Sequence, residues 1–163
     1  MPEALIALGG NVGDVRTTFR KAIEIFCNGE EVWLRKRSSD YRTPPWGVTD
    51  QPPFINAAIE VATGLPPRPL LERAQAVERI FGRHRENEQH WGPRTLDIDL
   101  IAYGDLILNE PDLVLPHPRL FERAFVLVPL GEIVPDRTIA GVRVHDALAR
   151  VDTGGIEKLP PRR

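Results

Sequence analysis

The order of its predicted strands and helices indicates that this chain has an α+β fold. Four stretches have the short apolar runs, or the alternation of apolar and polar residues, that is typical of strands. Two others place apolar residues at helical spacing. In chain order they form a β-α-β-β-α-β unit, the ferredoxin-like split arrangement, whose antiparallel sheet carries its helices on one face. More sequence follows this unit, so we expect C-terminal additions packed around the same sheet.

A glycine-rich turn joins the first strand to the first helix. Residues Ala4 to Leu8 form the apolar run of a short strand. Asp14 is a good N-cap for a helix that Asn28 and Gly29 close. A glycine-rich turn before a helix can hold phosphate. The GGNVGD segment matches neither a P-loop nor a dinucleotide fingerprint, which favours a structural turn.

Two strands follow, separated by a proline-rich loop. The strands are Val32 to Tyr41 and Phe54 to Thr63. The connecting segment, RTPPWGVTDQPPF, holds four prolines, which fix φ and remove backbone donors. Its length and its aromatic side chains, Trp46 and Phe54, argue against simple disorder. We therefore expect a binding loop here.

The second helix and the last strand of the unit flank another long loop. Pro69 opens the helix and Gly82 ends it. Gln75 and Glu78 lie off its apolar stripe, where solvation at the surface is the default explanation. The charged loop from Gly82 to Pro93 has the composition of a lid that closes over phosphates, or of an ordinary solvated loop.

The C-terminal part is expected to add short elements. Residues Leu120 to Leu127 have helical spacing, and Pro129 should kink or end that helix. Val142 and Val144 suggest a short strand before a last helix from His145 to Arg150. Residues after about 152 should be loose, and the whole chain, 1–163, is predicted to be one domain.

Composition excludes several classes of protein. The formal net charge is -2, which argues against a protein that binds nucleic acid. Cys27 is the only cysteine, so there is no disulfide framework and no thiolate metal cluster, and a small core residue is its simplest role. No apolar run is long enough for a signal peptide or a membrane span. We expect a cytoplasmic protein without membrane partners.

Two carboxylates on one strand are the strongest functional signal. Asp97 and Asp99 should point the same way, about 6.6 Å apart along the strand. Two divalent cations fit between such side chains and commonly serve displacement at phosphorus. The alternative is an edge strand with a solvated polar face. The full alternation in HWGPRTLDIDLIAY places Leu96, Ile98, Leu100 and Ala102 on one face and Thr95, Asp97, Asp99 and Ile101 on the other.

Nearby arginines point to a polyphosphate at this strand. Magnesium usually binds through one or two carboxylates plus substrate phosphates. Two magnesium ions cancel the negative charge of a nucleoside triphosphate, so the negative charge of the two aspartates is left unbalanced. Phosphoryl-transfer sites neutralise such an excess of negative charge with Arg or Lys. Arg83, Arg85 and Arg94 are close enough in sequence to supply it. The sequence therefore predicts a magnesium and polyphosphate site.

Four separated motifs resemble one family of enzymes. They are LGGNVGD, YRTPPWG with DQPPFINA, HWGPRTLDIDLI, and LPHPRLFERAFVLVPL. Together they are similar to the 6-hydroxymethyl-7,8-dihydropterin pyrophosphokinases of folate biosynthesis, over nearly the whole chain from Leu8 to Pro135. The resemblance implies transfer of diphosphate from ATP to the hydroxymethyl group of the pterin, with release of AMP. It also implies the same ferredoxin-like fold and a monomer or weak homodimer.

The resemblance further implies roles for individual residues. Asp97 and Asp99 would hold two Mg²⁺ ions and, with Arg83 and Arg94, would form the catalytic set. The expected ATP-binding residues are Gln75, Glu78, Arg83, Arg85, Trp91, Arg94, Leu100, Ile101, Val114, His117 and Arg123. The expected pterin-binding residues are Thr43, Pro44, Trp46, Phe54, Asn56, Asp97 and Phe125, with the two phenylalanines on either side of the flat ring.

Two positions depart from the family pattern. Gly10 stands where serine is common, and the loop between Arg85 and Trp91 is longer than in some members. Neither position touches the proposed metal pair. They leave open the geometry of the first turn and the closing of the lid.

Two other functions share part of this pattern. A nucleotidyltransferase or cyclase on a ferredoxin-like sheet would use the two aspartates but would not need an aromatic slot from Phe54 and Phe125. A ferredoxin-like RNA-binding module would carry exposed aromatics within a basic strand motif, which this acidic chain lacks. Formation of AMP from ATP separates the first alternative from the pyrophosphokinase, and retention of RNA tests the second.

Overall fold

The fold is an antiparallel sheet between two layers of helices, in a computed structural model that describes residues 1–45, 50–82 and 95–162. The strand order is β10-β3-β4-β1-β5, and β2 also pairs with β4. The order β5-β1-β4-β2 is consistent with the predicted ferredoxin-like unit. The strands are β1 (Glu3–Gly10), β2 (Val32–Arg37), β3 (Tyr41–Thr43), β4 (Phe54–Thr63), β5 (Asp97–Tyr103) and β10 (Glu157–Lys158).

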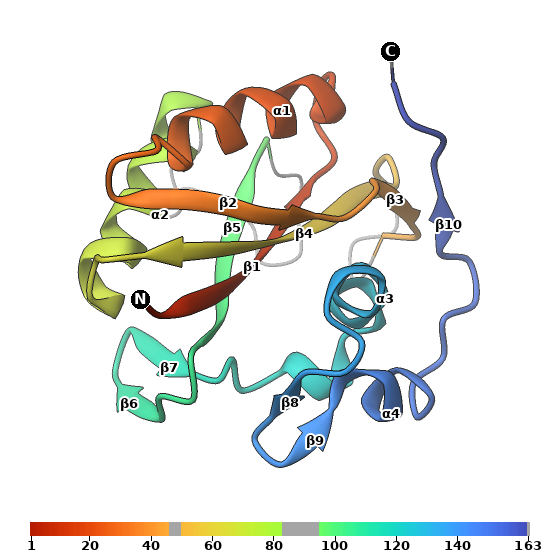
Figure 1. Ribbon diagram of the computed structural model, residues 1–163. Coiled ribbons are helices and arrows are strands. Elements are labelled where there is room, and N and C mark those ends of the chain that lie inside the picture. Colours follow the sequence, from red (N-terminus) through yellow and green to blue (C-terminus); the bar gives the residue numbers. More distant parts are fainter. Residues whose placement is uncertain (46–49, 83–94, 163) are drawn as a thin grey trace.

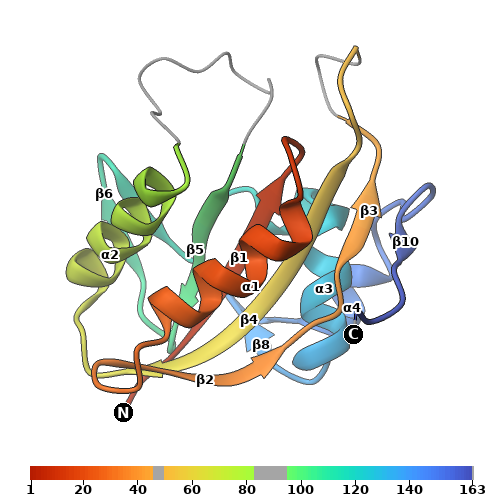
Figure 2. The same ribbon diagram turned by 90° about the horizontal axis from the view of Figure 1, so that it is seen from above.

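Two cores hold the layers together. Helices α1 (Val15–Phe26) and α2 (Pro67–Ile80) cover one face of the sheet over a first core that includes Phe19 and Ile98. Helix α3 (Ala124–Ile133) covers the other face over a second core that includes Leu127. Figures 1 and 2 show α1 and α2 on one side of the sheet and α3 on the other. The predicted unit therefore has helices on one face, and the C-terminal additions cover the second.

Local signals at the ends of α1 match the sequence prediction. The Asp14 side chain accepts a hydrogen bond from the backbone N–H of Thr17 at 3.3 Å, as an N-cap should. After the helix, the Asn28 carboxamide oxygen accepts three backbone N–H groups, with the Val32 N–H at 3.2 Å. Gly29 has a φ of 75°, a value that glycine adopts without strain. The turn into β2 is therefore fixed by side chains close in sequence.

The predicted strand from Val32 to Tyr41 is interrupted. Ser38 donates its backbone N–H to the Ala58 carbonyl at 2.9 Å, and its hydroxyl accepts the Ala58 N–H at 2.8 Å. Because the side-chain hydroxyl takes a ladder position, regular pairing stops and resumes at Tyr41. The result is two strands, β2 and β3, along the same side of β4.

A register shift in β5 corrects one predicted position. Ile6 pairs with Leu100 and Leu5 pairs with Ala102, so Ile101 is an extra residue between them. Ile101 and Ala102 consequently both lie in the second core. The prediction that Ala102 shares a face with Ile98 and Leu100 was wrong, because strict alternation ends at this bulge.

Helix α3 continues through Pro129 to Ile133, although a kink or end was predicted at the proline. Leu127, Pro129 and Leu130 are all buried, so packing on the sheet offsets the lost backbone hydrogen bond.

The remaining short elements are β6 (Leu108–Glu110), β7 (Leu113–Leu115), the 3-10 helix η2 (Leu120–Glu122), β8 (Thr138–Ile139), β9 (Val142–Arg143) and α4 (Val144–Leu148).

The segment after residue 152 differs from the loose tail that was expected. Strand β10 pairs with β3, and the Leu159 N–H donates to the Asp40 carbonyl at 2.9 Å. Arg16 donates to the Pro160 carbonyl at 2.6 Å and to the Asp40 carboxylate at 2.8 Å. Figure 1 shows this segment running past β3 at the side of the sheet. Its attachments come from residues far away in sequence, which composition alone does not reveal.

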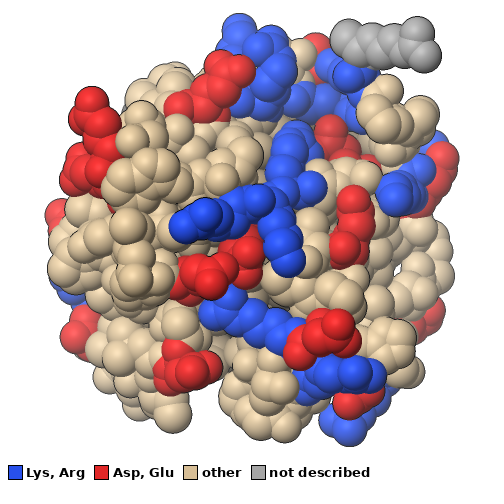
Figure 3. Space-filling model, in the orientation of Figure 1, with Lys and Arg blue, Asp and Glu red and all other residues tan. Residues whose placement is uncertain are grey.

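The surface carries charges of both signs side by side. On the face seen in Figure 3, lysine and arginine side chains are interleaved with aspartate and glutamate. In the described part of the chain, no helix combines the length and the apolar character that crossing a membrane requires.

Gly10 lies where two backbone segments meet closely. A Cβ atom at this position would lie 2.8 Å from the Thr95 carbonyl oxygen and 3.2 Å from Val15 Cγ1. A serine at this position would therefore force the chain entering β5 to move. The glycine allows that chain to pass directly against β1.

We predict that Gly10→Ala lowers the free energy of unfolding by about 2 kcal/mol, because the new methyl group overlaps backbone rather than a movable side chain. Urea unfolding followed by circular dichroism measures the change. Gly64→Ala is the matched control, since a Cβ at Gly64 has nothing within 4 Å. Equal stability of the two variants would contradict the close approach.

Candidate active site

One row across the sheet brings together residues from four strands. Gly9 of β1 stands opposite Asn56 of β4 on one side and opposite Asp97 of β5 on the other. Tyr41 of β3 stands opposite Asn56 and continues the row. Because adjacent strands are about 4.8 Å apart, the Asn56 and Asp97 backbones are about 10 Å apart. Gly9 has no side chain, so the space between them stays open.

Both candidate metal-binding carboxylates lie on the α3 face of the sheet. Asp97 pairs with Gly9 and Asp99 pairs with Ala7, whose side chain lies in the second core. Ile98, between them, lies in the first core on the opposite face. Directly opposed residues of antiparallel strands share a face. The prediction that the two acids point the same way is confirmed, and both side chains are partly exposed.

A buried hydrogen bond orients the amide of Asn56. The Thr43 hydroxyl donates to Asn56 Oδ1 at 2.7 Å, and Thr43 is 1% exposed. With the oxygen engaged, the Asn56 NH₂ group is the part left to act as a donor on this face. Phe54 stands opposite Thr43 and, two residues from Asn56, shares the same face. Thr43, Phe54 and Asn56 are therefore brought together beside the two acids.

Pro44 and Phe125 border this group from other segments. Pro44 is exposed and lies against the C-terminal segment, since a Cβ on Gly155 would be 2.9 Å from Pro44 Cγ. Phe125 stands in the first turn of α3, and the Arg123 guanidinium carbon lies 5.6 Å from the centre of its ring. This distance permits a cation–π interaction. Both residues lie in segments that border the α3 face of the sheet.

His117 is held as a neutral imidazole with a defined proton position. Its backbone N–H donates to the Ile101 carbonyl at 2.8 Å, and its Nδ1 accepts the Arg119 N–H at 3.1 Å. Burial, together with the charge of Arg123, lowers the pKa of His117 to about 4, and Asp97 opposes the shift. Since Nδ1 is an acceptor, the proton of the neutral ring is on Nε2. His117 can therefore donate one hydrogen bond to an anion.

Arg123 brings positive charge to the same group. Burial lowers the pKa of its guanidinium, whereas Asp99 and Asp97 raise it. An arginine remains protonated under such shifts. The charge of Arg123 thus lies within the electrostatic reach of both carboxylates, on the side of the sheet that they face.

A cavity of about 240 Å³ adjoins these residues. Asp99 and Leu100 of β5, Val114 of β7 and His117 line one part of it, and Gln75 of α2 lines another. Gln75, Leu100, Val114 and His117 were all predicted to contact the nucleotide, and the structure brings them together around this cavity. It lies beside the metal-binding candidates and not within the pterin-binding group.

Two predicted nucleotide contacts are enclosed by protein. The Ile101 side chain is 1% exposed within the second core, so only its carbonyl, which accepts from His117, is near the site. Glu78 is 2% exposed rather than solvated, and its carboxylate accepts the Ile98 N–H at 2.7 Å. The helical pattern placed Glu78 off the apolar stripe, but β5 packs against that side of α2.

One residue near the site was missed in the sequence. Asn11 is buried, and its NH₂ group donates to Gln51 Oε1 at 2.8 Å and to the Pro52 carbonyl at 3.0 Å. These bonds tie the turn after β1 to the segment that leads into Phe54. A lone asparagine in a glycine-rich turn gives no signal of such a distant partner. The remaining predicted site residues, Trp46, Arg83, Arg85, Trp91 and Arg94, lie outside the described residues.

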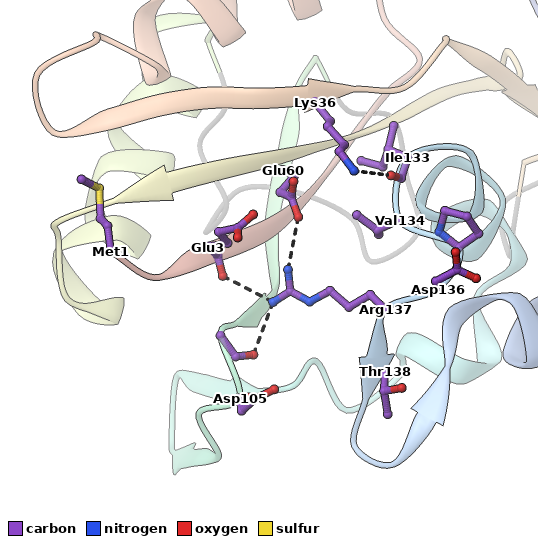
Figure 4. A pocket seen from close by; sticks show the side chains of 12 residues that line it. Met1, Glu3, Lys36, Glu60, Asp105, Ile133, Val134, Asp136, Arg137 and Thr138 are labelled. Atoms are coloured by element: carbon purple, nitrogen blue, oxygen red, sulfur yellow. Dashed lines mark hydrogen bonds and ion pairs between the residues drawn. The ribbon is translucent and has the colours of Figure 1, made fainter.

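A second cavity, of about 590 Å³, lies toward the other end of the sheet (Figure 4). Arg137 donates to the Glu60 carboxylate at 3.3 Å, and Lys36 donates to the Ile133 carbonyl at 3.2 Å. Burial raises the pKa of Glu60, and the neighbouring Glu3 carboxyl raises it further. These two bonds join α3 and the segment after it to β2 and β4, so they fasten the C-terminal additions to the sheet.

The arrangement on the α3 face defines a class of enzyme. Two carboxylates on one strand, a guanidinium and an Nε2–H donor match the requirements of phosphoryl transfer, in which positioning and charge neutralisation supply most of the catalysis. Sequence comparison identifies the family within this class. The model of the family 7,8-dihydro-6-hydroxymethylpterin-pyrophosphokinase (HPPK) matches residues 5–135.

Several curated proteins are similar over most of their length. A 2-amino-4-hydroxy-6-hydroxymethyldihydropteridine pyrophosphokinase of Methylorubrum extorquens is 46% identical, over 98% of this chain and 99% of that protein. The protein of the same name from Pseudomonas aeruginosa is 39% identical, over 95% of each chain. The Bacillus subtilis protein is 45% identical, over 80% of this chain and 77% of its own. The chain belongs to the HPPK family and is a pyrophosphokinase.

Solved structures support the fold. A crystal structure of Plasmodium falciparum HPPK-DHPS superimposes with a TM-score of 0.72 at 14% identity, over 91% of this chain and 44% of that chain. At such low identity the likeness shows the fold alone. It confirms that this arrangement of sheet and helices is the one found in HPPK domains.

We predict that His117 stays neutral well into the acid range in the ligand-free protein. Its pKa of about 4 lies below the ordinary value of 6.5, so the unfolded chain binds this proton more readily. The contribution to stability is complete above pH 6.5 and is lost as the pH falls toward 4. An NMR titration of the imidazole measures the pKa. A midpoint near 6.5 would contradict the partly buried, neutral ring.

Proposed function

We propose that this enzyme transfers the terminal diphosphate of ATP to the hydroxymethyl group of 6-hydroxymethyl-7,8-dihydropterin. The hydroxymethyl oxygen attacks the β-phosphorus, and the bond from that phosphorus to the oxygen shared with the α-phosphorus breaks. AMP leaves, the pterin becomes a diphosphate ester, and the hydroxyl proton passes to solvent. The placement of Asp97 in one row with Asn56, with Asp99 on the same face of β5, is the single observation that carries this proposal.

The donor set at Asp97 and Asp99 fits magnesium that arrives with a nucleotide. No group of three potential His, Cys, Asp or Glu ligands is present among the described residues. Magnesium is usually bound through one or two carboxylates, with water and substrate phosphates as the other ligands. We propose two Mg²⁺ ions, held by Asp97 and Asp99. When bound, they neutralise phosphate charge and lower the pKa of the attacking hydroxyl.

Residues of this chain neutralise and orient the rest of the triphosphate. His117 donates its Nε2–H to a phosphate oxygen, and Arg123 supplies positive charge on the same face. Arg83 and Arg94 complete the catalytic set, with Arg85 and Trp91 contributing to ATP binding. These last roles rest on the motif HWGPRTLDIDLI and its neighbours. Because charge is matched by fixed groups, no side chain has to act as a nucleophile.

The nucleoside part of ATP occupies the cavity beside β5. Gln75, Leu100 and Val114 line it, and Asp99 and His117 border it. The cavity therefore lies next to the groups that bind phosphate. Ile101 contributes through its carbonyl, which fixes His117.

The pterin occupies the other side of Asp97. Phe54 and Phe125 contact its two faces, and the Asn56 NH₂ group donates to an acceptor on its edge. Pro44, with Trp46, completes the edge, and Thr43, which is 1% exposed, takes part by holding the Asn56 amide. The distance of about 10 Å between the Asn56 and Asp97 backbones matches the width of a two-ring heterocycle with its hydroxymethyl group directed toward the acid.

The alternative functions fit less well. A nucleotidyltransferase would use the acids but not the Thr43, Phe54 and Asn56 group. An RNA-binding module is usually strongly basic, whereas the formal net charge of this chain is -2. The substrates of the family are small molecules, and a cytoplasmic monomer or weak homodimer remains our prediction for this chain.

We predict that the purified protein forms AMP from ATP only when Mg²⁺ and the hydroxymethyl pterin are both present. Release of pyrophosphate, or no turnover, would favour the nucleotidyltransferase.

Asp97→Ala and Asp99→Ala should each reduce turnover by at least about 100-fold, because the charge of the metal and phosphate complex loses its partner. Asp105→Ala is the control, since this exposed aspartate follows the other end of β5. Near wild-type turnover in either site variant would refute the metal assignment.

Phe54→Ala should weaken pterin binding, because one aromatic face is worth about 1 kcal/mol beyond its burial. The expected rise in Kd is about fivefold or more. Isothermal calorimetry with the pterin measures it, and ATP binding should not change. Phe54→Tyr keeps the ring and should bind the pterin nearly as well. Unchanged affinity in Phe54→Ala would exclude this residue from the pterin site.

A further inference from the structure

Strand β5 lies at the edge of the sheet, next to β1 alone. The outward N–H groups of an edge strand have no neighbouring strand to pair with. One of them, the Ile98 N–H, points to α2 and donates to the Glu78 carboxylate at 2.7 Å. This length is typical of a hydrogen bond to a charged acceptor. A side chain of α2 thus takes the ladder position that a further strand would occupy.

The bond is at the one residue that separates the two acids. Ile98 lies between Asp97 and Asp99, and its side chain is 2% exposed in the first core with Ala74 and Val77 of α2. The acids are on the opposite face. A displacement of the β5 backbone at Ile98 moves both neighbouring carboxylates, because Asp97 and Asp99 flank this residue. Holding the Ile98 N–H therefore restrains the positions of both carboxylates.

A buried carboxylate is costly, so its presence here calls for a specific role. Glu78 is 2% exposed, whereas Glu72, on the same helix, is exposed. An apolar residue at position 78 would continue the first core but would leave the Ile98 N–H without this acceptor. A buried donor that loses its partner is more costly than the bond is stabilising. The hydrogen bond from the Ile98 N–H of β5 thus gives the buried Glu78 carboxylate a specific role.

We infer that Glu78 is a positioning residue, which acts on the reaction through the Ile98 peptide and not by contacting the nucleotide. This inference rests on the proposed function of Asp97 and Asp99. Without the acceptor, the edge of β5 would move relative to α2 and the two acids would no longer share a fixed geometry. The loss should affect binding of Mg²⁺ with ATP and leave the pterin group of Thr43, Phe54 and Asn56 intact.

The test compares Glu78→Ala, Glu78→Gln and the matched control Glu72→Gln in the full chain. Glutamine keeps an oxygen that accepts the Ile98 N–H, and alanine does not. In Glu78→Ala, the Mg²⁺ concentration for half-maximal AMP formation should rise about tenfold or more, while the Kd for pterin changes less than about twofold. Glu78→Gln should restore most of the Mg²⁺ response, and Glu72→Gln should match wild type.

A second measurement does not depend on activity. Hydrogen exchange of the Ile98 amide, followed by NMR, should be at least about tenfold faster in Glu78→Ala than in wild type and slow again in Glu78→Gln. Chemical denaturation shows whether each variant is folded under these conditions. If Glu78→Ala does not fold, the comparison of Glu78→Gln with wild type remains, and a loss of Mg²⁺ response with a protected amide would overturn the inference.

Two further outcomes separate the inference from the function on which it rests. A wild-type protein that forms no AMP would refute the proposed function, whatever the exchange data show. A wild-type protein that is active, with Glu78→Ala giving faster Ile98 exchange but an unchanged Mg²⁺ response, would refute the positioning role alone. Equal losses with alanine and glutamine would indicate that the charge of Glu78 matters and not its hydrogen bond, which also contradicts the inference.

Discussion

The site depends on the antiparallel register of β1 with both of its neighbours. Gly9 stands opposite Asn56 and Asp97 at once, so one row of the sheet joins an amide and a carboxylate from distant parts of the chain. A Cβ on Gly9 would lie 3.0 Å from Asn56 Nδ2, so only glycine leaves the row open. A slip of one residue in the β1–β5 ladder would turn Asp97 and Asp99 into the first core.

Charge on the α3 face is balanced by groups with fixed protonation. Asp97 and Asp99 are close enough to repel, and Arg123 lies within reach of both. His117 adds a proton donor without adding a charge, because burial lowers its pKa to about 4. On the face that the two carboxylates share, Arg123 therefore supplies a guanidinium and His117 a neutral hydrogen-bond donor. Such preorganisation is what phosphoryl transfer requires of a protein.

The C-terminal additions are part of the site and not an appendage to it. They carry His117, Arg123 and Phe125 to the face that the elements from β1 to β5 leave open. Glu132 of α3 accepts hydrogen bonds from Ser39 and, at 2.6 Å, from the Tyr41 hydroxyl. Arg137, just after the same C-terminal end of the helix, reaches Glu60. Because α3 is fastened at β3 and at β4, the residues at its start have a defined place over the sheet.

The sequence by itself determined the order of strands and helices, the shared face of Asp97 and Asp99, and the family. These follow from periodicity and from motifs, which are local properties of the chain. Only the tertiary structure decided that Glu78 is buried behind β5, that Asn11 binds the segment before Phe54, and that the segment after residue 152 pairs with β3. It also placed a bulge at Ile101. Each of these depends on a partner far away in sequence, and the pattern of one segment carries no information about which segment will pack against it.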